Sequence, residues 1–286
     1  MTEHLLPVDK AHLHIEWVES SFAAASSQPP VLILHGGPGA DSRYLRPQLD
    51  AIANLGAGRR IYYYDQRGAD RSSQAEGEAP PSVSVHVADV EAVRRYIGVE
   101  KVRLIGYSWG ALLAMLYATQ YPQHIDRLVL LSPAPPTAAV RETYQLKMFE
   151  ALQRPAVQAL REEFAARRDS LSVEEQRRHR FALAVSSYFV EPRRALELTP
   201  FLVKQRLEAA IWNSLGPAFD LRPQLAELVR FPTLVIHGEQ DVIPIASAAE
   251  TAQLLHAELV RLPDCGHVPY IEAPDALFAA LTRFLA

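Results

Sequence analysis

VRLIGYSWGALLAMLYATQY, residues 102–121, is the stretch from which the organisation of the whole chain is predicted. Its first four residues form an apolar run that is long enough for a buried strand and too short for a helix. Gly106 to Gly110 then read G-x-S-x-G, and the apolar residues from Ala111 to about Tyr121 predict a helix that Pro122 ends. A serine at a sharp turn between a strand and a helix is typical of a nucleophile elbow.

Ser108, at the centre of this turn, is the predicted nucleophile. A strained backbone there projects the hydroxyl above the edge of the sheet, and Gly106 and Gly110 leave room for neighbouring backbone. The start of the following helix supplies N–H groups and a partial positive charge where a tetrahedral oxyanion would form. Because G-x-S-x-G also arises by chance, the prediction depends on the strand and helix that flank it.

The composition is that of an ordinary globular protein and excludes several functional classes. Of the 286 residues 49% are hydrophobic, and a net charge of -4 gives no electrostatic footprint for nucleic acid or an anionic membrane. The single cysteine, Cys265, excludes an internal disulfide framework. The first residues lack a basic region followed by an apolar core, and the longest apolar run is too short to cross a bilayer. We therefore expect a cytoplasmic protein.

Apolar runs that predict strands alternate with helical spacings on both sides of the elbow. This alternation predicts a mostly parallel, doubly wound α/β sheet with helices on both faces. The predicted strands are 13–18, 31–34, 60–65, 102–105, 127–132, 233–237 and 258–262. The predicted helices are 43–55, 83–97, 111–121, 245–256 and 273–285.

The pattern changes between about residues 137 and 219, where no convincing buried strand is found. This region carries charge-rich amphipathic patterns that predict helices. They cover 140–152, 157–168, 173–189 and 202–215. We therefore expect a core made of residues 1–136 and 222–286, interrupted by a helical cap at 137–221.

Asp241 and His267 are the predicted partners of the serine. A serine nucleophile needs a base to take its proton and a third group to hold that base in the right tautomer. Both residues come shortly after predicted strands, at the carboxyl ends where ligands bind in such sheets. The order Ser108, Asp241, His267 is the one expected for a nucleophile elbow on this kind of sheet. Taken singly, Asp241 could cap a helix and His267 could be a surface residue.

Two backbone N–H groups are expected to bind the oxyanion. One belongs to Trp109, directly after the nucleophile, and the other to the glycine loop His35–Gly39. Gly37 is the better candidate in that loop, because Pro38 has no N–H and Gly36 follows directly on a histidine that orients the loop. The remaining histidines are interpreted differently: His237 as packed or hydrogen-bonded, and His86, His124, His179 and His256 as surface residues.

HGGPG at His35–Gly39, DQRG at Asp65–Gly68 and the elbow G-x-S-W-G resemble the prolyl aminopeptidases, or proline iminopeptidases, of the α/β-hydrolase superfamily. The resemblance covers roughly residues 10–135 and 222–286 and is weaker in the cap. It implies an α/β-hydrolase fold, a triad of Ser108, Asp241 and His267, and oxyanion donors at Gly37 and Trp109. It also implies hydrolysis of short peptides at the N-terminal residue without a cofactor.

The chain departs from that family at two places. Asp70 stands where the second motif has a glycine, and Val242 stands where some members have a glutamate that binds the substrate ammonium. A carboxylate is required there, because an ammonium in a partly desolvated pocket needs a partner. Glu208, beside Trp212 in a predicted cap helix, is the best remaining candidate. A solvated helix face explains Glu208 equally well, so both interpretations stay open.

Three functions follow from these patterns. The leading one is a cofactor-free serine hydrolase acting through an acyl-enzyme on N-terminal residues of short peptides. A carboxylesterase for small hydrophobic esters is the alternative, and a hydrolase-like binding protein without turnover is the third. The sequence has no H-E-x-x-H, no clustered cysteine ligands and no phosphate loop, so no metal or nucleotide site is predicted. Assembly into a homo-oligomer stays open.

Overall fold

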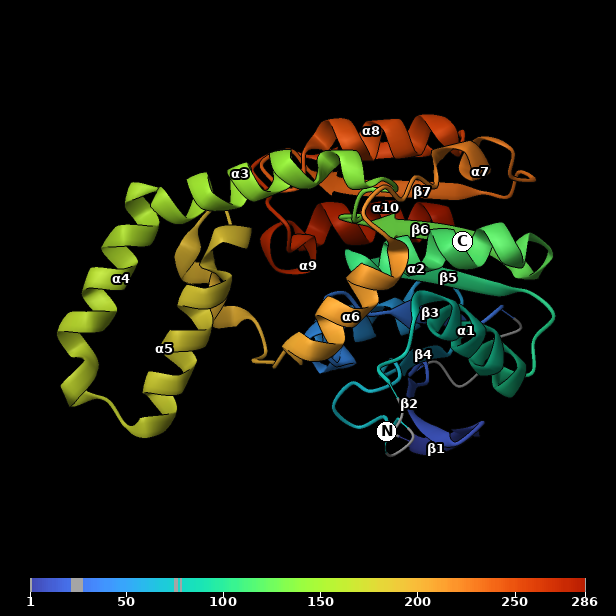
Figure 1. Ribbon diagram of the computed structural model, residues 1–286, viewed down its shortest axis with the longest axis horizontal. Helices are drawn as coiled ribbons and strands as arrows, with labels where there is room; N and C mark the ends of the chain where they lie inside the picture. The colour runs from blue at the N-terminus through green and yellow to red at the C-terminus, as the bar shows by residue number, and fades with distance from the viewer. Residues whose placement is uncertain (1, 22–27, 75–76, 78, 286) are drawn as a thin grey trace.

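A sheet of eight strands organises the computed structural model, which describes residues 2–21, 28–74, 77 and 79–285 (Figure 1). The spatial order is β1-β2-β4-β3-β5-β6-β7-β8. The first two strands run antiparallel to their neighbours, and every pair from β4 onward is parallel. The strands are β1 (Thr2–Val8), β2 (Ala11–Val18), β3 (Val31–Leu34), β4 (Ile61–Tyr64), β5 (Val102–Tyr107), β6 (Ile125–Leu131), β7 (Thr233–Gly238) and β8 (Glu258–Leu262).

Helices cover both faces of this sheet. They are α1 (Val83–Ile97), α2 (Trp109–Gln120), α3 (Arg141–Gln153), α4 (Pro155–Arg167), α5 (Val173–Val185), α6 (Gln205–Leu215), α7 (Arg222–Ala226), α8 (Ile245–Leu254), α9 (Pro269–Glu272) and α10 (Pro274–Leu285). One apolar core contains side chains of α1, α2 and α8, and a second, on the other face, contains those of α9 and α10. The α/β-hydrolase fold predicted from the sequence is confirmed.

β5 and α2, which flank the elbow, are buried along almost their whole length. Every residue of β5 is buried, as expected for a strand between parallel neighbours with helices on both faces. α2 is apolar on all sides, and such a helix is stable only inside a core. The serine between them is therefore held by two elements that are packed into the core.

One predicted helix differs from the observed structure, and one strand and two short α-helices are not predicted. Residues 43–55 form two 3-10 helices, Ser42–Leu45 and Gln48–Asn54, because Pro47 between them lacks the N–H of a continuous helix. No apolar pattern predicts β1. The strand predicted at 13–18, near the edge of the sheet, is β2 and is therefore second from that edge. The short helices α7 and α9 also escape prediction, because they span too few residues for a periodic pattern.

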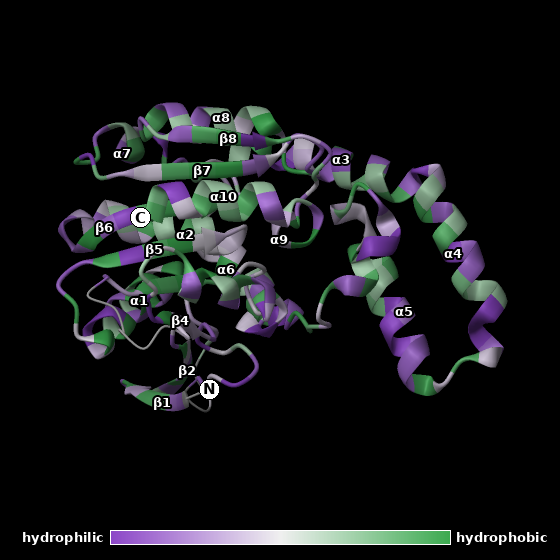
Figure 2. Cartoon of the chain, turned by 180° about the vertical axis from the view of Figure 1, so that it is seen from behind, coloured by the Kyte–Doolittle hydropathy of each residue, from purple (hydrophilic) through white to green (hydrophobic). Residues whose placement is uncertain are grey.

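The predicted cap begins and ends at one place in the structure. Thr137 and Asp220 form an antiparallel bridge, and Leu221 N donates to Pro136 O at 2.8 Å. Between these points α3, α4 and α5 form an arm that projects from the sheet layers (Figure 1). Figure 2 shows that α4 and α5 carry many hydrophilic residues, whereas β7 is mostly hydrophobic. The arrangement agrees with the division at 136/137 and 221/222, which stays a prediction.

α6 differs from the arm, because it packs on the core. Its Leu207 and Ile211 belong to the same apolar cluster as α1 and α2. Ser214 Oγ accepts a hydrogen bond of 3.0 Å from Val83 N at the start of α1. The last helix of the predicted cap is therefore fixed to the sheet layers, beside the elbow.

Candidate active site

Ser108 has a backbone conformation that L-residues rarely adopt, with φ 54° and ψ −117°. The glycines around it have no space for a side chain. A Cβ on Gly106 would lie 2.4 Å from Gly110 O, and one on Gly110 would lie 2.1 Å from Leu34 O. The elbow is thus as tight as the sequence pattern predicts, and the two glycines are required by backbone contacts of known identity.

Ser108, His267 and Asp241 form one hydrogen-bonded chain. His267 Nε2 lies 3.0 Å from Ser108 Oγ, and His267 Nδ1 lies 2.8 Å from Asp241 Oδ2. The three residues come from loops that follow β5, β8 and β7, so the carboxyl ends of three strands bring them together. Asp241 Oδ2 accepts the hydrogen bond from the N–H at His267 Nδ1. With the proton on Nδ1, Nε2 can accept the proton of the serine.

Asp241 is held in place by a second set of contacts. Its Oδ1 accepts a hydrogen bond of 2.8 Å from Ile243 N. His237 lies behind it, with Nε2 at 2.9 Å from Ile243 O and 3.6 Å from Asp241 Oδ2. Burial lowers the pKa of His237, so this ring is neutral and hydrogen-bonded, as predicted. The orientation of Asp241 is therefore fixed from the side opposite to His267.

The glycine loop after β3 lies directly against the serine. A Cβ on Gly36 would be 2.9 Å from Ser108 Cβ. Gly36 N donates to the Tyr44 hydroxyl at 2.7 Å, so this N–H is already used. In the part of the chain that the structure describes, the N–H groups of Gly37 and Trp109 donate to no protein acceptor. Both predicted oxyanion donors are therefore unoccupied beside the nucleophile.

Gln66 is a residue of this site that the sequence patterns do not identify. Its side chain accepts from Trp109 Nε1 at 2.8 Å and donates to His35 O at 2.8 Å. Its backbone N–H donates to His35 Nε2 at 3.0 Å. The DQRG motif marks the position, but only the fold shows that it meets both the glycine loop and the elbow.

Aromatic side chains surround His267 on the side away from Asp241. The Tyr107 hydroxyl donates to His267 O at 3.0 Å, and the Tyr188 ring lies 5.0 Å from the imidazole. His267 N donates to Tyr188 O at 2.7 Å, and the Tyr188 hydroxyl lies 3.4 Å from that of Tyr144. Tyr144 and Tyr188 come from the predicted cap, so cap residues form one wall of the site.

Glu208 and Trp212, one turn apart on α6, lie beside the glycine loop and the elbow. Trp212 packs edge-on against Trp109, with ring centroids 5.0 Å apart. Glu208 N lies only 3.5 Å from where a Cβ on Gly39 would be. Burial raises the pKa of Glu208, and among the described residues its carboxylate forms no ion pair. Glu208 is therefore a half-buried acid beside the glycine loop and lacks a counter-ion.

The charge of Glu208 acts on the two cap tyrosines, Tyr144 and Tyr188. Burial raises the pKa of Tyr188, and the charges of Asp241 and then Glu208 raise it further. The same two charges act on Tyr144, whose pKa is also raised first by burial. Asp241 and Glu208 thus influence the same pair of hydroxyls.

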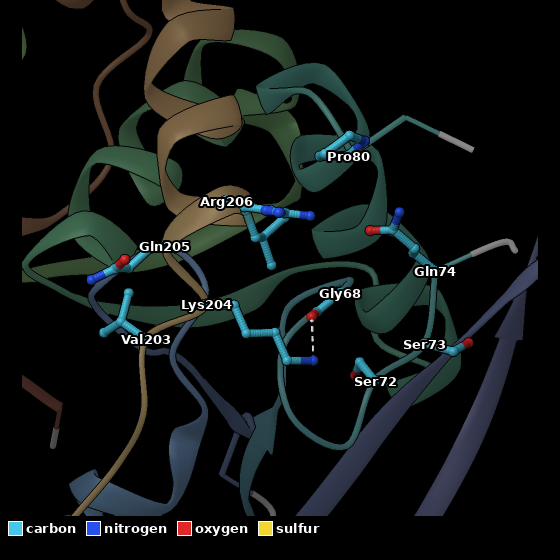
Figure 3. Close-up of a pocket in the computed structure, with 10 residues that line it drawn as sticks. Gly68, Ser72, Ser73, Gln74, Pro80, Val203, Lys204, Gln205 and Arg206 are labelled. Carbon is cyan, nitrogen blue, oxygen red and sulfur yellow. Dashed lines mark hydrogen bonds between the residues drawn. The ribbon is translucent and has the colours of Figure 1, made fainter. Parts of the chain in front are cut away.

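A groove of about 810 Å³ lies on the outer side of this region (Figure 3). It is lined by Gly68, Ser72, Ser73, Gln74, Pro80 and residues 203–207. None of the triad residues is among them. Lys204 donates to Gly68 O at 2.8 Å (Figure 3), and it also donates to Ala69 O at 3.1 Å. The groove therefore lies between the start of α6 and the DQRG loop, and Ser108, Asp241 and His267 do not line it.

His86 corrects an expectation from the sequence. The sequence interpretation places it at the surface, but it is fully buried on α1, with neither ring nitrogen hydrogen-bonded among the described residues. Its spacing from Val83 and Val90 puts it on the buried face of the helix. Cys265 is a buried packed residue, as expected. In the described ranges no group of three His, Cys, Asp or Glu side chains is arranged to hold a metal ion.

Residues 29–274 match the alpha/beta hydrolase fold family. A proline iminopeptidase of Levilactobacillus brevis is 28% identical over 275 residues, covering 90% of this chain and 88% of the relative. A pimeloyl-[acyl-carrier protein] methyl ester esterase of Nitrosospira multiformis is 33% identical over 189 residues, covering 63% of this chain and 67% of the relative.

A solved structure agrees with these relatives. A proline iminopeptidase-related protein of Thermus thermophilus is 26% identical, with a TM-score of 0.74 and coverage of 100% of this chain and 98% of the other. The resemblance to prolyl aminopeptidases is therefore confirmed at the level of the family. No helix among the described residues has the length and apolar character to cross a membrane.

Proposed function

The chain belongs to the α/β-hydrolase fold family, and on that premise we propose that it is a cofactor-free serine hydrolase that releases N-terminal residues from short peptides. The observation that carries the proposal is the chain of hydrogen bonds from Ser108 through His267 to Asp241. This arrangement supplies a nucleophile, a base and an orienting acid in the geometry that acyl transfer requires.

The proposed reaction has two halves. Ser108 Oγ attacks the scissile carbonyl carbon while His267 Nε2 takes its proton, and the carbonyl oxygen becomes an oxyanion. The tetrahedral intermediate collapses as His267 returns the proton to the leaving amine, and an acyl-enzyme ester remains on Ser108. A water molecule, deprotonated by His267, then attacks this ester, and His267 returns the proton to Ser108 Oγ as the acid is released. Asp241 stabilises the imidazolium in both halves.

Gly37 and Trp109 are the proposed oxyanion donors. Their N–H groups lie at the glycine loop and at the first residue of α2, on either side of the serine. The start of α2 adds the positive end of a helix dipole. Each such donor contributes roughly 10² to 10³ in rate where one has been removed from a comparable site.

Glu208 is the proposed partner of the substrate's amino group. A half-buried carboxylate without a counter-ion is unfavourable until a cation occupies the site, and an N-terminal ammonium would supply one. The backbone of Glu208 lies beside Gly39 of the glycine loop, and this supports an ammonium site close to the first residue of the substrate. Trp212 and the aromatic wall around Tyr188 offer an apolar surface for a proline ring or a small apolar side chain.

An esterase is the alternative, and two observations favour it. One relative is named as a methyl ester esterase, at 33% identity. Val242 is buried beside Asp241 at the position where some prolyl aminopeptidases have a glutamate, so this chain has one acid fewer for an ammonium. Small hydrophobic esters need the triad and the aromatic wall, but they do not need Glu208.

The experiment compares turnover of proline p-nitroanilide with that of p-nitrophenyl butyrate. The parent, Ser108→Ala and Glu208→Gln are measured on both substrates. Glu142→Gln, at an exposed cap position, is the matched control for loss of a carboxylate. We expect Ser108→Ala to abolish turnover of both. Glu208→Gln should lower kcat/KM for the anilide by about 10-fold or more, as for a charged hydrogen bond, and spare the ester.

Other outcomes would change the proposal. Ester turnover without anilide turnover would identify an esterase. Equal losses on both substrates in Glu208→Gln would remove the ammonium site but keep the serine hydrolase. If neither substrate shows turnover that depends on Ser108, the triad has another use, such as binding without chemistry.

A further inference from the structure

We infer that Gln66 is a positioning residue that holds the two oxyanion donors in register with each other. The inference rests on the proposed function, because it concerns the geometry of the proposed oxyanion hole. The two donors come from separate parts of the chain, the loop after β3 and the start of α2. Gln66, just after β4, is hydrogen-bonded to both of these segments.

The hydrogen bonds of Gln66 leave no freedom in how its side chain is oriented. An indole N–H only donates and a backbone carbonyl only accepts. Gln66 Oε1 must therefore face Trp109 Nε1, at 2.8 Å, and Gln66 Nε2 must face His35 O, also at 2.8 Å. A flipped amide would place like groups together at both ends. The carboxamide thus acts as a bridge of fixed direction and length.

The imidazole of His35 completes the bridge. Its Nε2 accepts from the backbone N–H of Gln66 at 3.0 Å, so the proton of the neutral ring lies on Nδ1, which faces Gly36 O at 3.0 Å. Burial lowers the pKa of His35, although the nearby Asp65 opposes this shift. His35 therefore accepts two hydrogen bonds from Gln66, one at its carbonyl from the side-chain amide and one at its ring from the backbone N–H. His35 is two residues before Gly37, so both bonds act on the glycine loop.

Burial makes this bridge stiff. His35, Gln66 and Trp109 are each at most 1% exposed, so water cannot replace a hydrogen bond that is lost. The backbones also touch, since a Cβ on Gly110 would lie 2.6 Å from His35 O. A displacement of the glycine loop relative to α2 must therefore break the Gln66 bridge or leave its polar groups unpaired. An oxyanion hole gains its effect from donors that need no rearrangement during the reaction.

A structural role alone would give a different signature. If Gln66 only satisfied buried polar groups, its removal would lower the free energy of unfolding and leave the chemistry of the folded enzyme unchanged. If it positions the donors, its removal lowers kcat and weakens binding of a tetrahedral mimic, and KM for the planar substrate changes little. The two roles are therefore separable in folded protein.

The test uses Gln66→Met, which keeps the volume and removes both side-chain hydrogen bonds. Trp109→Phe removes the indole N–H from the other end and keeps the backbone N–H. Gln158→Met is the control, because Gln158 also loses a side-chain amide bond, to Leu152 O, but lies in the arm. The readouts are kcat and KM on p-nitrophenyl butyrate and the inhibition constant of an alkyl boronic acid, which forms a tetrahedral adduct with the serine.

We expect Gln66→Met to lower kcat by about 10- to 100-fold, since misplacing a catalytic group by about 1 Å costs up to that much. KM should change by less than about 2-fold, and the boronic acid should bind more weakly by a factor close to that in kcat. Trp109→Phe should lower kcat in the same way, and the double variant should be less impaired than the product of the single effects. Gln158→Met should match the parent.

Several results would overturn the inference. A folded Gln66→Met with the kcat and boronic acid affinity of the control excludes positioning. If Gln66→Met does not fold, Trp109→Phe alone decides, and full kcat in that variant counts against the bridge. Multiplicative effects in the double variant also contradict it. Absence of turnover dependent on Ser108 in the parent would overturn the proposed function itself, and the inference with it, and the Ser108→Ala control identifies that case.

Discussion

Glu208 illustrates how burial of a single carboxyl sets the pH range of a proposed activity. Burial raises its pKa, so it becomes protonated at a higher pH than an exposed glutamate. Only the ionised form attracts an ammonium. Once the substrate is bound, its ammonium lowers the pKa of Glu208 again. The protonation of Glu208 therefore affects mainly the free enzyme and the binding of substrate.

The first prediction concerns this pH dependence. As the pH falls through the raised pKa of Glu208, KM for proline p-nitroanilide should rise, because the carboxylate is lost while the substrate keeps its ammonium. KM for p-nitrophenyl butyrate should not rise over the same range. Steady-state kinetics on both substrates across the acidic range up to neutral pH measure this. Glu208→Gln should show a high KM for the anilide that no longer depends on pH, and an unchanged acid limb in that variant would contradict the assignment.

Individual site residues differ in how far the sequence could identify them. Ser108, Asp241 and His267 each follow a strand and stand in the expected order, and the fold brings them within hydrogen-bonding distance. Their catalytic roles stay predictions. Gln66 and Tyr188 give no comparable signal, because their importance depends on contacts between segments far apart in the chain. Side-chain chemistry near a strand end is local information, whereas a bridge between two loops is not.

At the scale of elements, the elbow depends on contacts between backbones. Gly110, in the first turn of α2, approaches the carbonyl groups at the end of β3 more closely than any Cβ allows. The same carbonyl region leads into the glycine loop. A side chain at position 110 would therefore both destabilise the fold and displace the proposed oxyanion donors.

The second prediction is that Gly110→Ala destabilises the protein by about 3 kcal/mol or more, because its Cβ would lie 2.1 Å from Leu34 O, a backbone atom that cannot rotate away. Gly98→Ala is the control. A Cβ there has nothing within 4 Å, so only the left-handed backbone, φ 80° and ψ 26°, costs free energy, about 1 to 2 kcal/mol. Urea unfolding followed by tryptophan fluorescence measures both. Equal losses in the two variants would show that β3 and α2 can separate without cost.

Regular periodicity decides which elements can be predicted. α1 has the bounds expected from its valine spacing, and β5 to β8 all coincide with apolar runs that predict strands. Residues 43–55 have a helical apolar spacing too, but Pro47 interrupts the hydrogen bonds, and the apolar side chains are buried from two 3-10 helices instead. The docking of α6 on the core could not be predicted, because a helical pattern specifies an apolar face and not its partner.

Lys204 fastens the start of α6 to the core. Its ammonium donates to the carbonyl groups of Gly68 and Ala69 (Figure 3), and its backbone N–H donates to Gly39 O at 3.1 Å. Glu208 follows one turn later, and its N–H donates to Lys204 O at 3.0 Å. One residue thus connects the DQRG loop, the glycine loop and the proposed ammonium site.

The third prediction is that Lys204→Met lowers kcat/KM for proline p-nitroanilide several-fold, because α6 carries Glu208 and loses its attachment at one end. The free energy of unfolding should fall by no more than about 1 kcal/mol, since the ammonium is partly exposed and solvent replaces part of the interaction. Lys101→Met, at an exposed lysine before β5, is the matched control. An anilide kcat/KM equal to that of the control would exclude a role for Lys204 in placing Glu208.

For the whole molecule, pH acts on stability through histidines that fold into apolar surroundings. His35, His86 and His237 are each fully buried, and burial lowers the pKa of all three. His35 and His237 have hydrogen-bond partners at the site, and their nearby carboxylates oppose the shift. Among the described residues His86 has neither, and burial, together with the nearby charge of Arg67, lowers its pKa to about 3. Protonation of His86 is therefore expected to destabilise the fold in acid.

The fourth prediction follows from that difference. An unfolded chain protonates His86 near its ordinary pKa of 6.5, and the folded chain does so only at about 3. Between these values the unfolded state binds the extra proton, so stability is lost as the pH falls below 6.5. At about pH 5 the loss from this residue alone is about 2 kcal/mol, at roughly 1.36 kcal/mol for each pH unit below 6.5. His86→Leu removes it and also removes two unpaired ring nitrogens.

Urea unfolding of the parent and of His86→Leu at about pH 7.5 and about pH 5 separates this contribution from all other titrations, because the carboxyls and the remaining histidines are common to both proteins. The difference in unfolding free energy between the two proteins should grow by about 2 kcal/mol in favour of His86→Leu on going to the lower pH. A constant difference would mean that the folded protein accommodates a charged His86. The depth of α1 in the core, and the absence of any described acceptor near that ring, argue that it does not.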